Sequence, residues 1–268
     1  SEDTYRTLTA VDSAIMVIDA AKGIEAQTLK LFEVCRLRDV PIITFINKVD
    51  REGQDPFDLM QEVADRLALD TVPMTWPVGS GNRLRGLYDL NHDKFVAYHS
   101  DKHAEAMGFG IDSPEISKYV PADQLAELRE EAELAKGACA EFDMDLFRAG
   151  ALTPVFFGSA LRHLGVDELL DAVAAFAPAP RPQPSTVRDV SPETKVSGFV
   201  FKVQANMDQN HRDRIAFMRL CSGKFKRGMK LKLSSSGKTI SVHNPILFFA
   251  QDRELVDEAW PGDIIGIP

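Results

Sequence analysis

The sequence predicts an α/β fold: a doubly wound parallel sheet in the first part of the chain, followed by a small antiparallel β-barrel domain. Three observations lead to this prediction. Strand and helix patterns alternate up to about residue 80 and again after about residue 150, a proline-rich segment follows, and short strands with Gly-containing turns come last. Repeated strand–helix–strand units imply a parallel sheet with right-handed crossovers. Such a sheet buries its strands on both faces.

The first strands of this sheet are short apolar runs. Residues 14–20 (AIMVIDA) and 41–47 (PIITFIN) each predict a strand buried on both faces. A charged helical pattern separates them, and a second helix is expected over residues 55–69. Asp55 is the expected N-cap of that helix, and Pro56 occupies its first helical position. These two residues therefore mark the start of the second helix.

The alternation continues with residues 71–79 (TVPMTWPVG), which predict a third strand. Residues from about 80 to 150 are expected to be an insertion with an irregular part and a charged surface helix over 122–142 that covers the sheet edge. The apolar side of that helix consists of Leu125, Leu128, Ala132 and Ala135. The pattern resumes with a strand at 153–160 and a helix at 165–178.

Prolines mark the domain boundary. Residues 177–193 contain five prolines, which favour extended backbone and cannot continue a helix. We therefore expect one domain over 1–180, a linker over 181–193 and a β-barrel domain over 194–268.

Charge is unevenly distributed. The net charge of the 268-residue chain is −9, yet residues 195–245 hold 11 Lys or Arg and only 2 Asp or Glu. A basic segment in an acidic chain is a candidate contact for a phosphate backbone, and a solvated barrel surface explains it equally well. The candidate contact residues are Arg212, Arg214, Lys224, Lys226 and Arg227.

Several classes of protein are not expected. No apolar run reaches the length of about 18 residues that a membrane-spanning helix needs, and no secretory leader pattern is present. Cys35, Cys139 and Cys221 are isolated thiols without metal-ligand spacing, which favours a reduced, cytoplasmic compartment. We expect no contact with membranes or DNA.

The segment FINKVDREG contains Asn47, Lys48 and Asp50 at the end of a predicted strand, where ligands bind in open α/β sheets. An Asp carboxylate can accept from both N1–H and the amine of guanine, whereas adenine presents a lone pair there. Such a site rejects the wrong base by roughly 10⁴ to 10⁵. The Asn side chain can tie the loop together, and the Lys stem can lie over the purine. The alternative is a capped strand terminus without a ligand.

A second loop supplies the remaining contact. Gly158, Ser159 and Ala160 follow another predicted strand, and a backbone N–H of this loop can donate to guanine O6. Ser159 alone would be explained as the N-cap of the next helix. Two loops with matching roles favour a guanine site.

These residues resemble those of the translational GTPases. Asn47–Asp50 resembles their guanine-specificity motif, the Gly158–Ala160 loop resembles the one that contacts O6, and residues 17–28 (VIDAAKGIEAQT) are similar to the stretch before the specificity motif. Residues 213–231 and 261–267 look like their second, β-barrel domain. The resemblance spans almost the whole chain and is weakest at about residues 90–150.

The family's phosphate loop, Gly-x-x-x-x-Gly-Lys-[Ser/Thr], and its Asp-x-x-Gly switch are missing from this sequence. The resemblance therefore implies a partial P-loop-GTPase-like sheet that lacks its first strands, in an N-terminally truncated fragment. GTP or GDP is the implied cofactor, with Mg²⁺ ligands expected upstream. The implied site residues are Asn47, Lys48, Asp50, Ser159 and Ala160, and none is assigned a catalytic or metal-binding role.

Within the family, residues 1–23, 33–52 and 74–90 most resemble the branch that acts in translation termination. That resemblance implies a ribosome-dependent GTP hydrolase that releases class I release factors, with ribosomal RNA, ribosomal proteins and those factors as partners. One alternative is another member of the family, of the elongation factor G type. Another is that this chain alone is a non-enzymatic scaffold that contacts the base but binds nucleotide very weakly.

Overall fold

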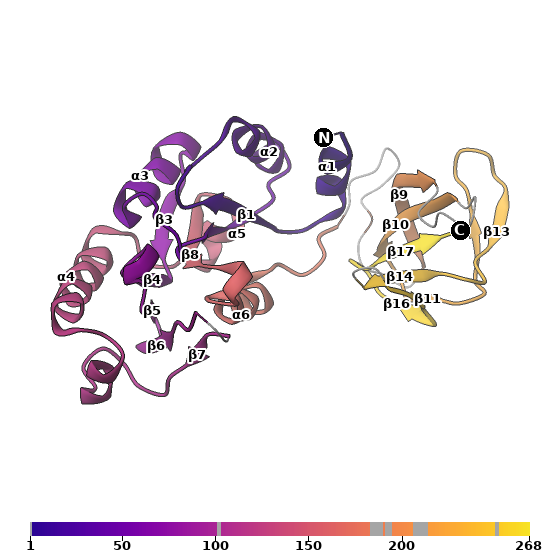
Figure 1. Cartoon of the computed structure of the whole chain (residues 1–268). Coiled ribbons are helices and arrows are strands. Elements are labelled where there is room, and N and C mark those ends of the chain that lie inside the picture. Colours follow the sequence, from indigo (N-terminus) through magenta and orange to yellow (C-terminus); the bar gives the residue numbers. More distant parts are fainter. Residues whose placement is uncertain (1, 101–102, 183–189, 191–194, 206–213, 250–251) are drawn as a thin grey trace. The chain divides into compact units, whose positions relative to one another are not determined.

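The computed structural model describes the chain except for residues 1, 101–102, 183–189, 191–194, 206–213 and 250–251 (Figure 1). It divides into two compact units: an α/β unit, Ser13–Ala177, and an antiparallel unit that combines Ser1–Asp12 with Pro178–Pro268. The first twelve residues thus group with the antiparallel unit. Most of the expected linker, 181–193, lies outside the described residues.

The α/β unit is built on a four-stranded parallel sheet, which confirms the predicted architecture. Its strand order is β1 (Ala14–Asp19), β2 (Ile42–Asn47), β8 (Leu152–Gly158) and β3 (Asp70–Pro73). α2 (Ala26–Arg36) and α3 (Pro56–Leu67) connect strands of this sheet, and α6 (Val166–Phe176) follows β8. α3 and α6 lie on opposite sides of the sheet (Figure 1).

Two apolar layers cover this sheet. Ile46 and Phe157 pack with α3 on one face, while Phe45 and Phe156 pack with α5 (Met144–Arg148) and α6 on the other. Successive side chains of a strand point to opposite faces, so a continuous apolar run fills both layers. The caps of α3 are also as expected: Asp55 Oδ1 accepts from the N–H of Phe57 at 2.8 Å, and Pro56 is its first residue.

The expected third strand is in fact two strands. β3 ends at Pro73, and Met74 still donates its N–H to Val155 O at 2.9 Å. At Thr75 the side chain replaces the backbone: its Oγ1 accepts from Phe157 N–H at 2.8 Å and lies 3.2 Å from Phe157 O. The chain therefore leaves the parallel sheet as β4 (Thr75–Val78), which begins a new sheet.

The insertion is more regular than expected. It contains an antiparallel sheet of β4, β5 (Gly86–Asp89), β6 (Lys94–Ala97) and β7 (Glu105–Ala106), followed by α4 (Ala122–Ala138) and α5. Short 3-10 helices, η2 (Gly81–Arg83) and η3 (Pro114–Lys118), connect these elements. The predicted apolar side of α4 is buried. It packs on β4 rather than on an edge of the parallel sheet, and Trp76 Nε1 donates to Glu131 Oε2 at 2.8 Å.

The second unit confirms the expected antiparallel structure. Its main sheet has the order β15 (Asp252–Leu255), β14 (Ile246–Phe249), β17 (Ile264–Ile267), β10 (Arg214–Ser222) and β9 (Ser197–Ala205). Two further pairs are β11 (Phe225–Lys226) with β16 (Glu258–Ala259), and β12 (Lys230–Lys232) with β13 (Thr239–Ser241). Leu220, Phe225 and Ile265 are fully buried in its core.

An ion pair attaches the N-terminal segment to the rest of this unit. It contains α1 (Glu2–Thr7) and η1 (Leu8–Ala10). Asp12, which follows, accepts a hydrogen bond from Arg219 of β10 at 2.5 Å. The Arg219 side chain is only 1% exposed. A buried guanidinium needs such a partner, because an isolated buried charge is very costly.

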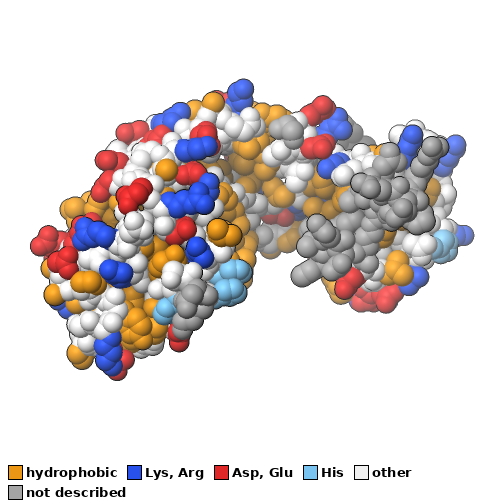
Figure 2. Space-filling model, in the orientation of Figure 1, with side chains coloured by type: hydrophobic (Ala, Val, Ile, Leu, Met, Phe, Trp, Pro, Cys, Tyr) orange, Lys and Arg blue, Asp and Glu red, His pale blue; other side chains and the backbone are white. Residues whose placement is uncertain are grey.

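On the face of the α/β unit seen in Figure 2, acidic and basic side chains are interspersed. In the described ranges, no helix combines the length and apolar character needed to cross a membrane.

Candidate functional site

The carboxyl ends of three parallel strands line up in one row. Asp19 at the end of β1 pairs in register with Asn47 at the end of β2, and Asn47 pairs with Gly158 at the end of β8. The loops that follow these strands therefore meet at one edge of the sheet. Ligands of open α/β sheets bind beyond this edge.

Asn47 joins two of these loops. Its Oδ1 accepts hydrogen bonds from the N–H of Lys48 at 2.8 Å and from the N–H of Ala160 at 3.0 Å. Val49 N–H donates to Gly158 O at 3.2 Å. The two loops singled out in the sequence are thus in direct contact. Within the described residues, Asn47 Nδ2 has no hydrogen-bond partner.

Lys48 is held by a residue that the sequence did not identify as part of this site. Its backbone is left-handed, with φ of 73°, and its Nζ lies 2.6 Å from Asp19 Oδ2. Asp19 Oδ1 also accepts from Ala21 N–H at 2.9 Å, which closes the end of β1. The hydrogen bond from Lys48 lowers the pKa of Asp19. The sequence did contain a signal for this contact. β1 and β2 end at the same edge of the sheet, which places their terminal side chains together.

Asp50 has a different environment. Its side chain is half-buried, and it forms no hydrogen bond or ion pair with any residue that the structure describes. A carboxylate with free lone pairs can accept two hydrogen bonds from one planar partner. Asp50 therefore retains the acceptor capacity that a guanine edge requires.

The Ser159–Ala160 loop is closed by its own backbone. Ser159 N–H donates to Leu164 O at 2.9 Å, and Leu164 N–H donates to Ser159 O at 3.0 Å, around η4 (Ala160–Arg162). The Ser159 side chain makes no capping hydrogen bond. Its Oγ is buried and has no partner among the described residues. The N-cap interpretation therefore does not explain this hydroxyl.

Glycine is required before this loop. A Cβ on Gly158 would lie 2.4 Å from Leu164 O and 2.7 Å from the ring of Phe45. Both distances are far below van der Waals contact. The strand end and the loop closure can pack this closely only without a side chain.

The residues present fit a guanine base. Asp50 and Asn47 Nδ2 keep free polar groups, and the buried Ser159 hydroxyl lacks a partner, which is rare for buried polar atoms. The expected O6 donor is a backbone N–H of the Gly158–Ala160 loop; that of Ala160 donates to Asn47 Oδ1 here, so its contact with O6 requires sharing of this donor. For Mg²⁺, no group of three or more His, Cys, Asp or Glu side chains is placed to bind a metal within the described ranges.

Comparisons with known proteins agree with this architecture. A family model for the elongation factor Tu GTP binding domain matches residues 1–179, and one for elongation factor G domain 2 matches residues 195–268. The crystal structure of ttk003000868 from Thermus thermophilus has a similar fold, with a TM-score of 0.72 and 22% sequence identity. The similarity covers 99% of this chain and 40% of that chain, so the present chain spans less than half of that protein. Because the first family model covers more than half of the sequence, the chain belongs to the translational GTPases, with a GTP-binding domain of the elongation factor Tu type followed by a domain of the elongation factor G domain 2 type.

Proposed function

We propose that the edge formed by β1, β2 and β8 binds the base of GTP or GDP. Asp50 accepts from guanine N1–H and the exocyclic amine, Asn47 holds the two loops together, and the stem of Lys48 lies over the purine. Ser159 and Ala160 contact the O6 side. The observation that supports this most strongly is the hydrogen bond from Ala160 N–H to Asn47 Oδ1, which unites loops 113 residues apart.

The GTP that this site recognises would be hydrolysed in a ribosome-dependent reaction. Phosphate and Mg²⁺ binding need groups beyond the base-reading residues, and we assign none of them within these 268 residues. Nucleotide affinity of the chain alone is therefore expected to be weak, and the chain alone inactive in hydrolysis. The chain alone would then be a scaffold that contacts the base without hydrolysing the nucleotide.

Among the translational GTPases, we propose the role of bacterial peptide chain release factor 3, which releases class I release factors in the cytoplasm. Its support is the likeness of residues 1–23, 33–52 and 74–90 to that factor. A role of the elongation factor G type is the alternative. The test is the dissociation rate of a labelled class I release factor from terminated ribosomes with the natural protein and GTP. Acceleration is expected, and acceleration of translocation instead would favour the alternative.

The antiparallel unit would contact the ribosome through positive charge, but fewer residues qualify than the sequence suggested. Lys224 and Lys226 pair with Glu258, and Arg227 lies 3.6 Å from Asp257. Arg212 lies outside the described residues. Arg214 of β10 and Lys230, Lys232 and Lys238 on and beside β12 and β13 are exposed and have no acidic partner in the described part of the unit, and they are the better candidates. RNA binding through them should weaken steeply with salt.

Base selectivity tests the site itself. The affinities for GDP, ADP and xanthosine diphosphate are measured with the chain and with Asp50→Asn. We expect guanine to be preferred by the unmodified chain and xanthine by the variant, because an Asn amide can donate to the xanthine C2 carbonyl. Asp58→Asn on α3 is the matched control. An unchanged guanine preference in Asp50→Asn would contradict the proposal.

A further inference from the structure

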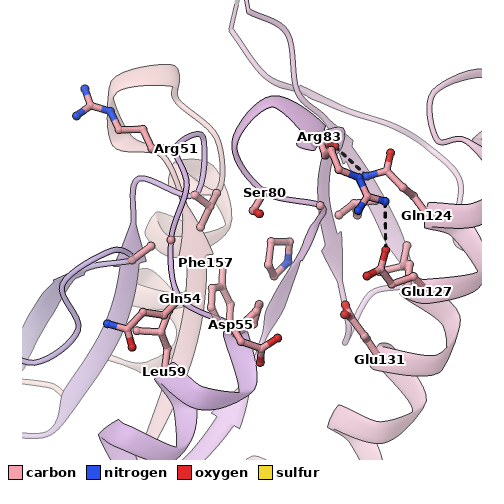
Figure 3. Close-up of a pocket in the computed structure, with 18 residues that line it drawn as sticks. Arg51, Gln54, Asp55, Leu59, Ser80, Arg83, Gln124, Glu127, Glu131 and Phe157 are labelled. Atoms are coloured by element: carbon pink, nitrogen blue, oxygen red, sulfur yellow. Dashed lines mark hydrogen bonds and ion pairs between the residues drawn. The ribbon is translucent and has the colours of Figure 1, made fainter.

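A cavity of about 310 Å³ lies beside the Asn47–Asp50 loop and contains none of the proposed base contacts (Figure 3). Its walls come from the segment 49–59, the end of β4 with the turn at Ser80–Arg83, and α4. The turn is fixed to the loop, because Gly81 N–H donates to Val49 O at 3.3 Å. The volume lies at the lower end of the range of small-molecule sites.

The floor of this cavity is apolar. Val49, Leu59, Val78, Leu128 and Phe157 line it and are all buried. An apolar floor with a few convergent polar groups is the usual composition of a ligand site. It suits a short hydrocarbon stem.

Two carboxylates with free oxygens line this cavity, Asp55 at an exposed position and Glu131 at a partly buried one. Asp55 and Glu131 point toward one another from opposite walls in Figure 3. Asp55 Oδ1 caps α3, and Glu131 Oε2 accepts from Trp76 Nε1. Neither of their second oxygens has a partner among the described residues. Burial raises the pKa of Glu131, and the charges of Glu127 and Asp55 raise it further against the opposing hydrogen bond from Trp76.

Most other polar groups of the cavity are already engaged or directed elsewhere; the Ser80 hydroxyl, which also lines it, has no hydrogen-bond partner among the described residues. Arg83 lies 3.6 Å from Glu127. Gln124 Nε2 donates to Arg83 O at 2.9 Å, and its Oε1 accepts from Arg85 Nε at 3.2 Å. The Arg51 side chain extends away from the cavity in Figure 3. The free charged groups of the cavity are therefore the Asp55 and Glu131 carboxylates, and a cationic donor would satisfy them.

We propose that this cavity binds a guanidinium group carried on a short apolar stem. The stem packs on the apolar floor, and the planar cation donates to Asp55 and Glu131 from between them. Two sources share this chemistry: a free alkylguanidinium compound and the arginine side chain of another protein. The inference does not depend on guanine binding, and its test contains no nucleotide.

Butylguanidinium is titrated into the chain against butylurea, its neutral analogue of the same shape. Binding is followed by calorimetry and by the fluorescence of Trp76 in a Trp260→Phe background, which leaves Trp76 as the sole tryptophan. One-to-one saturable binding of the cation, with at least about tenfold weaker binding of the urea, is expected from the loss of a charge-assisted hydrogen bond. Equal binding of the two compounds, or no binding of the cation up to about 10 mM, overturns the proposal.

Glu131→Gln tests the assigned carboxylate. Glutamine keeps an acceptor for Trp76 but removes the charge, so affinity for butylguanidinium should fall about tenfold or more. Glu130→Gln is the control, because the neighbouring residue of α4 is exposed and does not line the cavity. Unchanged affinity in a Glu131→Gln variant with native circular dichroism contradicts the proposal.

Binding of two capped peptides, Gly-Arg-Gly and its citrulline counterpart, distinguishes a partner's arginine from a free alkylguanidinium compound. Binding of the arginine peptide at least as tightly as butylguanidinium, without binding of the citrulline peptide, supports the inference and assigns the cavity to a partner's arginine. Binding of butylguanidinium alone supports it and assigns the cavity to a free ligand.

Discussion

In the α/β unit, Asp50 keeps a half-buried carboxylate without a partner at the end of a strand, whereas in the antiparallel unit Arg219 is buried and paired with Asp12. Asp50 is only partly shielded from water and has no partner in the described part of the chain, whereas the fully buried Arg219 guanidinium is held by Asp12, although its Nε has no partner there. A fully buried charge needs a partner within the fold, whereas a partly buried carboxylate can remain open to a ligand. The Asp12–Arg219 pair therefore maintains structure, while the proposed base site keeps a carboxylate that a ligand can use.

The largest effect on stability is expected from Asp12→Ala, which leaves the Arg219 guanidinium buried without its partner. Breaking a buried pair on one side costs about 3–5 kcal/mol of unfolding free energy. Urea unfolding, with amide exchange of β10 and β17 to localise the change, measures it. Asp3→Ala removes the exposed partner of Lys202, 3.4 Å away, and should cost at most about 1 kcal/mol. Equal losses in the two variants would show that the buried Asp12–Arg219 pair stabilises the antiparallel unit no more than the exposed Asp3–Lys202 pair does.

Gly158→Ala should produce the next largest loss. Its Cβ would collide with Leu164 O and the Phe45 ring, and overpacking of this kind costs about 1–3 kcal/mol. The control is a glycine whose replacement should raise stability instead of lowering it: a Cβ on Gly137 of α4 meets no atom within 4 Å. Gly137→Ala should therefore stabilise the chain by about 0.5–1 kcal/mol. Thermal unfolding of both variants provides the comparison, and a neutral Gly158→Ala would mean that the loop closure tolerates a side chain.

Asn47→Ala should have a smaller effect on stability but a large effect on the site. It leaves the N–H groups of Lys48 and Ala160 without their shared acceptor, at a cost of about 1–2 kcal/mol. The Ala160 amide should then exchange faster with solvent, and guanine selectivity should be lost. Asn82→Ala, at an exposed position in η2, is the control. Unchanged protection of Ala160 would show that the loops are held together by other contacts.

The smallest effect is the pH dependence of the Asp19–Lys48 pair. The pKa of Asp19 is lowered in the folded chain, first by its hydrogen bond with Lys48. Its contribution to stability is therefore present above the unfolded pKa of about 3.9 and is lost as pH falls through the lower folded value. Because Lys48 is 46% exposed, less than about 1 kcal/mol is expected.

A carboxyl NMR titration tests this pair directly. In Lys48→Met the pKa of Asp19 should rise toward its ordinary value, while that of Asp93, lowered first by Tyr88, should not change. An unchanged pKa of Asp19 would show that Lys48 does not lower it.

The sequence predicted those features that depend on local pattern. The apolar runs at β1 and β2 identified the parallel sheet, and Asp55–Pro56 identified the start of α3, because burial and capping leave local signals. It did not predict the separation of β3 from β4, because this depends on the Thr75 side chain meeting Phe157 far along the chain. The contact of Asp19 with Lys48 was not predicted either, because it depends on the register between β1 and β2.

The four-residue strands β5 and β6 were missed for a related reason. Each is too short for its alternation to stand out from an irregular segment, and both are stabilised by pairing with each other. The candidate base residues themselves were identified from the sequence, but the hydrogen bond that joins their loops could not be.

The most direct test of the guanine site is an amide chemical-shift titration of the chain with GMP and, separately, with AMP. We expect GMP to shift the amides of Asn47–Asp50 and Ser159–Ala160, and AMP to leave them unchanged at the same concentration. Equal shifts with both nucleotides, or shifts confined to other parts of the chain, would contradict the proposal of a guanine site.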